Sequence, residues 1–369
     1  MKDWLRRVFG RDPAPRGISV RHLDDEQVAE REEQRRRGAA AARIEAFDGA
    51  PRLPLTEVGE VQLPDELVHL GVAFDDRLIV VGSTADPSAT FAGRDESPGC
   101  ASFPHSTASE RYAIDVELLH VDGGVERRRV DGVPVAHPFV QLAPSGDLVI
   151  VGARARWADG RAEHNAWLVS QGGTVGGSFC AGDGIQNAQV TPAGALWVAY
   201  FDEGVFGNFG WGNPGSPEPL GRSGLVCWSL DGELRYGFEA PAGFGPIDDC
   251  YAMCAFEETI WACYYSDFPV VRVGADFDVV GWACGVGGAH AIAATDDRAL
   301  LVGGYRGLFD RAVVATLASD GSTEQTVFQL VMPDGTDVPD SARLVARGQR
   351  LHVVVGGLWL TLDLDKLPL

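Results

Sequence analysis

The sequence predicts an all-β fold, a six-bladed β-propeller of four-stranded blades with a short N-terminal helical extension. Six copies of one hairpin pattern follow one another along the 369 residues, each an apolar run, a tight turn and a second apolar run. Shifting the chain by 104 residues superposes Cys180 on Cys284 and Gly184 on Gly288. If two repeats span that shift, each holds about 52 residues, which is close to one four-stranded blade. A two-sheet sandwich would have many short strands without this period.

Residues 1–48 are expected to form a basic helical extension and linker. Residues 1–10, MKDWLRRVFG, have apolar side chains on one helical side, which is typical of a small membrane-surface or partner-binding helix. A frayed tail is the alternative. Asp24 or Asp25 can cap a second helix that extends towards Ala42, and Glu–Arg pairs four residues apart support it.

Residues 49–369 are expected to form the propeller. Tight turns such as Asp75-Asp76 join the first two strands of each blade, and turns such as Asp122-Gly123 join the last two. The last repeat reaches the end of the sequence after roughly three strands, so a strand within 55–64 is inferred to complete it and close the ring. The expected blades are approximately 67–133, 134–184, 185–246, 247–288, 289–337 and 338–369, with five or seven blades as alternative counts.

Every long connection falls on one face of the predicted propeller, and the tight turns fall on the other. The long connections include 82–113, the run ARARWADGRAEHN in the second blade, and 200–221, YFDEGVFGNFGWGNPGSPEPLG. Long loops over one end of a rigid scaffold are a common setting for a binding site. The loop-rich face is therefore the expected binding face, with 200–221 as one of its walls.

Acidic, amide, histidine and aromatic side chains are expected to meet at this face, because the channel strands begin there. Several carboxylates in one place would raise their own pKa values or recruit a cation. Solvated loop carboxylates, a strand-start Asp that binds backbone N–H groups, and a structural histidine at His290 are the alternatives. The candidate ligand-binding residues are Asp183, Asn187, Asp202, Glu203, Phe206, Trp211, Asp248, Asp249, Tyr264, Tyr265, Asp267, His290, Tyr305 and Arg306.

A metal site is the second hypothesis for the same face. Its ligands would surround a divalent cation such as calcium and support a hydrolase. The cysteines lack the spacing of a zinc site, and those within 250–263 are expected to be core thiols. No GxSxG nucleophile elbow is present, and no glycine run has the setting of a phosphate loop. The candidate metal ligands are Asp248, Asp249, Asn187 and His290.

The charge of the chain is strongly negative and unevenly spread. The net charge is −21, although residues 1–43 hold more basic than acidic side chains. An acidic body repels phosphate backbones, so nucleic acid is not an expected partner, whereas cations and basic proteins are attracted. No apolar run reaches the length of a membrane span. The protein is therefore expected to be cytoplasmic, without a transmembrane segment, and peripheral membrane contact is considered only for residues 1–10.

The repeats resemble, at the level of fold, NHL-type and SMP-30/gluconolactonase-type six-bladed propellers. The second group is a metal-dependent lactonase family with carboxylate and amide ligands at the channel mouth, parts that Asp248, Asn187 and Asp202 would play by analogy. The stretch 200–273, with FDEGVFGN, GLVCWSLDG, DDCYAM and YYSDFPVVRV, also resembles uncharacterised bacterial propeller proteins. That second resemblance implies no activity.

These observations favour a protein that binds a ligand or a protein partner through an acidic, aromatic, loop-rich face at the channel mouth. A divalent-metal-dependent hydrolase or lactonase of SMP-30-like type is the alternative. A structural scaffold that docks a partner through its N-terminal helices is the third hypothesis. The first hypothesis requires neither an enzymatic activity nor a cofactor.

Overall fold

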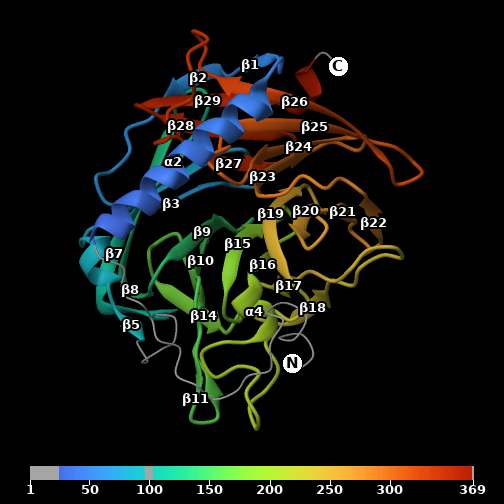
Figure 1. Cartoon of the computed structure of the whole chain (residues 1–369). Coiled ribbons are helices and arrows are strands. Elements are labelled where there is room, and N and C mark those ends of the chain that lie inside the picture. Colours follow the sequence, from blue (N-terminus) through green and yellow to red (C-terminus); the bar gives the residue numbers. More distant parts are fainter. Residues whose placement is uncertain (1–24, 96–102, 368–369) are drawn as a thin grey trace.

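The computed structural model describes residues 25–95 and 103–367, which build six blades around a central channel, each with four antiparallel strands of its own (Figure 1). The prediction of a six-bladed β-propeller is confirmed. The blades, in chain order, are β3 (Leu67–Val72), β4 (Leu78–Ser83), β7 (Thr107–Leu119) and β8 (Val125–Val135); β9 (Pro138–Leu142), β10 (Leu148–Gly152), β13 (Ala166–Val169) and β14 (Val175–Phe179); β15 (Ile185–Val190), β16 (Ala195–Tyr200), β17 (Leu225–Ser229) and β18 (Leu234–Gly237); β19 (Asp249–Phe256), β20 (Thr259–Tyr265), β21 (Val270–Val273) and β22 (Val279–Trp282); β23 (Ala289–Ala294), β24 (Arg298–Gly303), β25 (Arg311–Leu317) and β26 (Thr323–Val331); and β27 (Arg343–Arg347), β28 (Arg350–Val355), β29 (Leu358–Asp363) and β2 (Thr56–Glu60).

The core lies between neighbouring blades. The innermost strands β3, β9, β15, β19, β23 and β27 contact one another in cyclic order and enclose the channel. The second strand of a blade is covered on both faces, which explains its unbroken apolar sequence: β16, ALWVAY, is buried throughout. Leu196 and Val198 pack towards blade two, and Trp197 and Ala199 pack towards blade four. Burial of a side chain such as Leu196 or Val198 stabilises the fold by roughly 1.5–3 kcal/mol.

Two N-terminal strands pair with the edge strands of the last two blades. Strand β2 pairs antiparallel with β29, so the segment 55–64 contributes the fourth strand of blade six. Strand β1 (Arg52–Pro54) pairs parallel with β26 and adds a fifth strand to blade five, which the sequence did not indicate. Two sheet edges are covered in this way, which protects them from pairing with other chains.

The helical extension contains α2 (Asp25–Phe47), which ends five residues beyond the expected Ala42. Its last turns are fastened to the connection between β24 and β25. Arg43 Nη1 and Nη2 donate to the buried Asp310 carboxylate over 2.5 and 2.8 Å, and the Arg43 guanidinium lies 5.7 Å from the centre of the Phe309 ring. The proposed helix in residues 1–10 lies outside the described residues. None of the helices described here is long and apolar enough to span a membrane.

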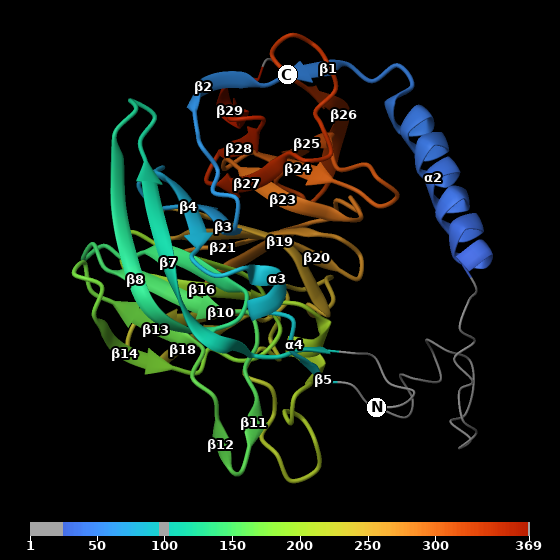
Figure 2. The same ribbon diagram turned by 90° about the vertical axis from the view of Figure 1, so that its left-hand side faces the viewer.

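The long connections of blades one to three contain short elements of their own. In blade one, the expected loop 82–113 contains α3 (Pro87–Thr90), and β7 begins at Thr107, inside that range. The connection in blade two forms a ribbon of β11 (Trp157–Ala158) and β12 (Arg161–Ala162). The connection in blade three begins with α4 (Asp202–Phe206). Figure 2 shows α2, α3 and α4 on the same side of the propeller, which we call the mouth face.

Candidate functional site at the channel mouth

Four innermost strands carry a β-bulge at the same position, near the mouth face. The strand register shifts between Leu67 and His69 in β3, and the corresponding shifts occur in β15, β19 and β23. Bulges re-aim side chains and are frequent next to functional sites. The residues within the four bulges are Val68, Gln186, Tyr251 and His290.

A cavity of about 160 Å³ occupies the channel below these bulges, and side chains from all six innermost strands line it. We call it the channel cavity. None of its described lining residues is Asp, Glu, Lys or Arg. Two wider hollows of about 500 and 490 Å³ share His69 with it and open towards the mouth face. The polar side chains of the channel cavity are His69, Gln141, Gln186, Asn187, Gln189 and His290.

The far end of the channel is closed by polar side chains that cross it. Gln189 Oε1 accepts from Ala255 N over 2.8 Å, and Gln189 Nε2 donates to the carbonyl of Ala346 over 3.3 Å. Arg347 is buried and donates to the carbonyls of Val72 and Val190 over 3.3 and 2.5 Å. The channel cavity therefore has a floor, and its open end is the mouth.

Two polar atoms in the wall of the channel cavity are buried without a hydrogen-bond partner, His69 Nε2 and Gln141 Oε1. The His69 ring stands edge-on to the Phe139 ring, with 5.7 Å between centres. A Cβ at Gly71 would lie 2.7 Å from His69 Nε2, so this glycine leaves the space that the imidazole occupies. Burial lowers the pKa of His69 to about 4, against a hydrogen bond to Val140, so the ring is neutral at pH 7.

His290 and Asn187 face the same cavity. The surrounding channel wall lowers the pKa of His290, although part of its ring is exposed to solvent. Asn187 Nδ2 makes one long contact of 3.4 Å with the carbonyl of Met253. Both side chains are therefore neutral and able to bond to a small molecule in the channel. Of the predicted ligand residues, these two belong to the channel cavity.

Acidic and aromatic predicted residues meet on blades three to five, above the channel. Asp249, half-buried at the start of β19, has its pKa raised to about 6 by burial and by the charge of Asp202 on α4. Asp249 pairs in register with Tyr265 of β20. No Lys, Arg or His among residues 25–95 and 103–367 forms an ion pair with either carboxylate. The two acids therefore repel each other, and no basic side chain of the described residues pairs with them to offset the repulsion.

Four aromatic rings stand beside these carboxylates. Phe268 lies 5.4 Å from Tyr251 and 5.7 Å from Tyr265, in edge-to-face geometry. The hydroxyl of Tyr305 lies 2.9 Å from that of Tyr251. Tyr265 and Tyr305 are 46% and 51% exposed, which leaves part of each ring in solvent. We call Asp202, Asp249, Tyr251, Tyr265, Phe268 and Tyr305 the acidic-aromatic rim.

The loop 201–221 has a structural role that the sequence did not indicate. Asp183 is buried and binds Arg154 through two hydrogen bonds of 2.9 and 3.0 Å, and Arg154 Nη2 also lies 2.6 Å from Glu203. Trp211 is 3% exposed, and its Nε1 donates to the carbonyl of Ala155 over 2.8 Å. These side chains fasten the loop to blade two. Asp183 and Trp211 offer a ligand almost no surface in this conformation.

The remaining predicted ligand residues differ in how far they are buried. Tyr264 is buried, and its hydroxyl donates to the carbonyl of Gly245 over 3.0 Å, so it belongs to the core. Phe206 is 53% exposed at the end of α4. Asp267 and Arg306 are exposed on the connections of blades four and five. Burial raises the pKa of Asp248, whose backbone N–H donates to the carbonyl of Tyr265.

The four candidate metal ligands are divided between two places. Asn187 and His290 line the channel cavity, whereas Asp248 and Asp249 are not among its lining residues. No group of three or more His, Cys, Asp or Glu within the described part of the chain converges closely enough to hold a metal ion. The cysteines of 250–263 are free and buried, and burial raises the pKa of Cys254 to about 12, as expected for core thiols.

The importance of Gln141 was missed from the sequence, although a signal was present. The runs VQLAPSGDL and AQVTPAGAL align through their shared turn, which puts Gln141 at the position of Gln189. A polar residue in the same place of two channel strands is a departure from the apolar repeat. His69 lies near the start of its strand, and nothing in its local sequence distinguishes a buried ring from an exposed one.

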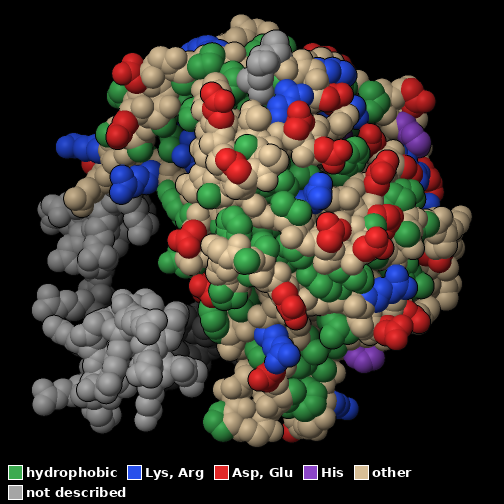
Figure 3. Space-filling model, turned by 90° about the vertical axis from the view of Figure 1, so that its right-hand side faces the viewer, with side chains coloured by type: hydrophobic (Ala, Val, Ile, Leu, Met, Phe, Trp, Pro, Cys, Tyr) green, Lys and Arg blue, Asp and Glu red, His purple; other side chains and the backbone are tan. Residues whose placement is uncertain are grey.

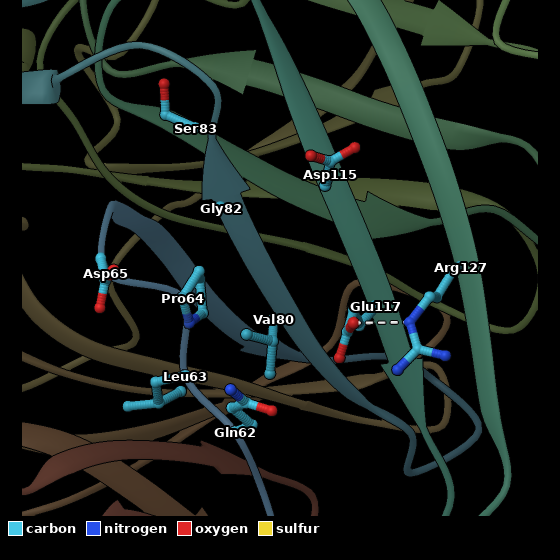
Figure 4. A pocket seen from close by; sticks show the side chains of 10 residues that line it. All are labelled: Gln62, Leu63, Pro64, Asp65, Val80, Gly82, Ser83, Asp115, Glu117 and Arg127. Carbon is cyan, nitrogen blue, oxygen red and sulfur yellow. Dashed lines mark hydrogen bonds and ion pairs between the residues drawn. The ribbon is translucent and has the colours of Figure 1, made fainter.

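A further hollow of about 320 Å³ lies on the side of blade one, where 62–65 crosses β4 and β7 (Figure 4). Its visible ion pair joins Glu117 to Arg127 over 2.8 Å, and the Arg127 side chain is 70% exposed. The hollow has no buried polar atom without a partner among the described side chains that line it. It is therefore a weaker candidate than the mouth. Figure 3 shows a different flank, the right-hand side of Figure 1, on which acidic side chains are scattered and basic ones are fewer.

The chain resembles a family model over a short range and several solved structures at low sequence identity. A model of the YxzG family matches residues 225–302, less than a quarter of the chain, from β17 into β24. No curated protein sequence matches. Similar solved structures include a catalytically inactive virginiamycin B lyase from Staphylococcus aureus (10% identity, 82% of this chain and 97% of that chain, TM-score 0.40). A gluconolactonase from Xanthomonas campestris is similar too (14% identity, 84% and 89%, TM-score 0.42). So is a PQQ-bound aldose sugar dehydrogenase from Streptomyces coelicolor (11% identity, 84% and 97%, TM-score 0.43). The propeller fold that the repeats indicated is shown by the six blades of the chain itself. At TM-scores of 0.40 to 0.43, these three likenesses support no inference about its role.

Proposed function

We propose that this protein is a binding protein whose acidic-aromatic rim holds a positively charged organic group of its ligand. The observation that carries the proposal is the pair Asp202 and Asp249, which lie close enough to repel and have no basic partner among the described residues. A cation between them would relieve that repulsion. The exposed faces of Tyr265 and Tyr305 would add cation–π attraction of roughly 0.5–2 kcal/mol.

The chemistry of the rim favours an organic cation over a metal ion. A calcium site needs six or more oxygen ligands, whereas the rim offers two carboxylates among aromatic rings. Guanidinium and substituted ammonium groups are more weakly hydrated than metal ions and lie readily on aromatic faces. The negative charge of the whole chain would raise the rate at which such a ligand arrives.

The proposal is tested by equilibrium binding of two probes, N-acetyl-arginine amide and an arginine-containing basic peptide. Asp249→Asn and Tyr305→Ala should each weaken binding about tenfold. Asp276→Asn is the matched control, because Asp276 is exposed in the turn between β21 and β22, away from the mouth face. Binding of both probes with equal affinity indicates a free small cation, and binding of the peptide alone indicates a protein partner. If the rim variants bind both probes as the wild type does, the proposal fails.

A further inference from the structure

We propose that the channel cavity is a second, separate binding site, for a small, uncharged, polyhydroxylated molecule. The main observation behind this proposal is that His69 Nε2 and Gln141 Oε1 are buried in the cavity wall without a hydrogen-bond partner. A buried polar group without a hydrogen bond destabilises a fold, so a bound molecule that supplies the missing hydrogen bond would offset that cost. Gln141 is 2% exposed and lines the cavity.

The two unpartnered atoms differ in their hydrogen-bonding capacity. Gln141 Nε2 donates to the carbonyl of Val140 over 3.1 Å, and the unpartnered Oε1 is an acceptor. The ring of His69 is neutral at pH 7, and its Nε2 accepts or donates according to the tautomer. Hydroxyl groups of a ligand match both atoms, because a hydroxyl group both donates and accepts.

The other residues that line the channel cavity limit which class of ligand it can bind. Gln186 and Asn187 have amides that both donate and accept, as hydroxyl groups do. None of the described lining residues is charged, so a charged ligand would lose hydration without an opposite charge in return. Phe139 and Met253 offer apolar surface for the C–H groups of such a molecule. A short carbon skeleton with hydroxyl groups can donate and accept hydrogen bonds, carries no charge and has C–H groups that can contact the apolar surface.

The molecule has a route to the site. The two mouth hollows that share His69 with the cavity lead outwards past Phe309 on one side and Phe91 on the other. The floor of Gln189 and Arg347 closes the opposite end. A ligand would therefore enter and leave at the mouth face. The site is distinct from the acidic-aromatic rim, because Asp202 and Asp249 are not among the cavity's lining residues.

Two variants separate a binding role from a structural one. Gln141→Leu removes the unpartnered oxygen and keeps a side chain of similar size, so it should abolish ligand binding while leaving thermal stability equal or higher. Gly71→Ala places a methyl group against His69 Nε2 and should turn the ring out of position without changing its chemistry. Gln171→Leu is the control, since Gln171 is exposed in the turn between β13 and β14.

The test is calorimetric titration of the full chain with glycerol, myo-inositol and D-glucose, with gluconate and glucosamine as charged counterparts. We expect at least one neutral probe to bind saturably, both cavity variants to lose about tenfold or more in affinity, and the charged counterparts to bind more weakly. Asp249→Asn should bind the neutral probe as the wild type does, which separates this site from the rim. The proposal is overturned if no neutral probe saturates, in which case the cavity holds water only, or if the cavity variants bind unchanged.

Discussion

Arg154 and Asp183 form an ion pair that is almost completely buried, with 4% and 2% of their side chains exposed. The pair joins the long connection of blade two to the start of blade three, and Glu203 and the ring of Phe209 lie against the same guanidinium. The loop 201–221, which on its sequence could have been a free wall of the binding face, is thereby fixed to its neighbour. A rigid loop of this kind can position the carboxylate of Asp202 opposite Asp249.

Removing one partner of this pair should destabilise the whole fold. Asp183→Ala leaves a buried guanidinium with only part of its counter-charge, so we expect a loss of about 3 kcal/mol in the free energy of unfolding. Urea unfolding measures it. Glu218→Ala is the matched control, because its ion pair with Arg222 is exposed, and it should change stability by less than about 0.5 kcal/mol. Equal stability of the two variants would show that the pair does not hold the loop.

The carboxyl of Asp249 should make stability depend on pH in the direction opposite to most acids. Its pKa in the folded protein is raised from 3.8 to about 6, so between those values the folded state binds the proton more readily than the unfolded state. Stability contributed by this group therefore rises as pH falls through 6. We expect Asp249→Asn to be more stable than the wild type at pH 7.5, by on the order of 1 kcal/mol after solvent screening, and to lose that advantage near pH 4.5. An equal difference at both pH values would contradict this assignment.

His352 should have the opposite effect and cause acid sensitivity. Its ring is fully buried, stacks on Trp359 and lies 3.1 Å from the Trp359 Nε1 atom. Burial lowers its pKa from 6.5 to about 3, so the unfolded chain takes up the proton first. Stability is therefore full above pH 6.5 and is lost as pH falls. By pH 5 the loss should be about 2 kcal/mol.

The measurement for His352 is the pH dependence of urea unfolding in the wild type and in His352→Phe, which keeps an aromatic ring beside Trp359. The phenylalanine variant has no proton to bind, so its stability should fall less between pH 7 and pH 5. The two proteins are compared by the slope of their unfolding free energy against pH. A loss of stability that the substitution causes equally at every pH therefore does not affect the comparison. Parallel slopes for the two proteins would contradict the prediction.

The hypothesis of a metal-dependent hydrolase makes its own prediction. If Asp248, Asp249, Asn187 and His290 held a divalent ion, the native mass of the purified protein would include that ion and would fall after EDTA treatment. Because Asn187 and His290 line the channel cavity whereas Asp248 and Asp249 lie outside it, we expect the mass of the metal-free chain before and after treatment. A bound divalent ion that EDTA removes, and that Asp249→Asn abolishes, would favour the hydrolase and direct attention to lactone substrates.

The fold was predictable because its signals repeat. Six hairpins with turns such as Asp75-Asp76 gave the blade count, and the incomplete last repeat indicated that an N-terminal strand was needed. Strand β1 was not predictable, since its three residues, Arg52–Pro54, pair through the backbone and carry no periodic pattern.

The candidate site was predictable only in part. Asp202, Asp249, Tyr265 and Tyr305 were proposed as ligand residues because strand ends and long connections converge on one face of a propeller. Burial could not be inferred for Asp183 or Trp211, since it depends on contacts with Arg154 and Ala155, residues of another blade. Whether Gln141 Oε1 has a hydrogen-bond partner likewise depends on the assembled channel, so it could not be inferred from the local sequence.

The most direct test of the central claim is the pH dependence of cation binding at the acidic-aromatic rim. N-acetyl-arginine amide, or the basic peptide if it alone binds, would be titrated calorimetrically into the wild type and Asp249→Asn between pH 7.5 and pH 5. Because the pKa of Asp249 is about 6, the affinity of the wild type should fall as the carboxylate is protonated, whereas the weaker affinity of the variant should stay nearly constant. A wild-type affinity that does not change with pH, or that the variant matches at pH 7.5, would contradict the assignment of the rim as a cation site.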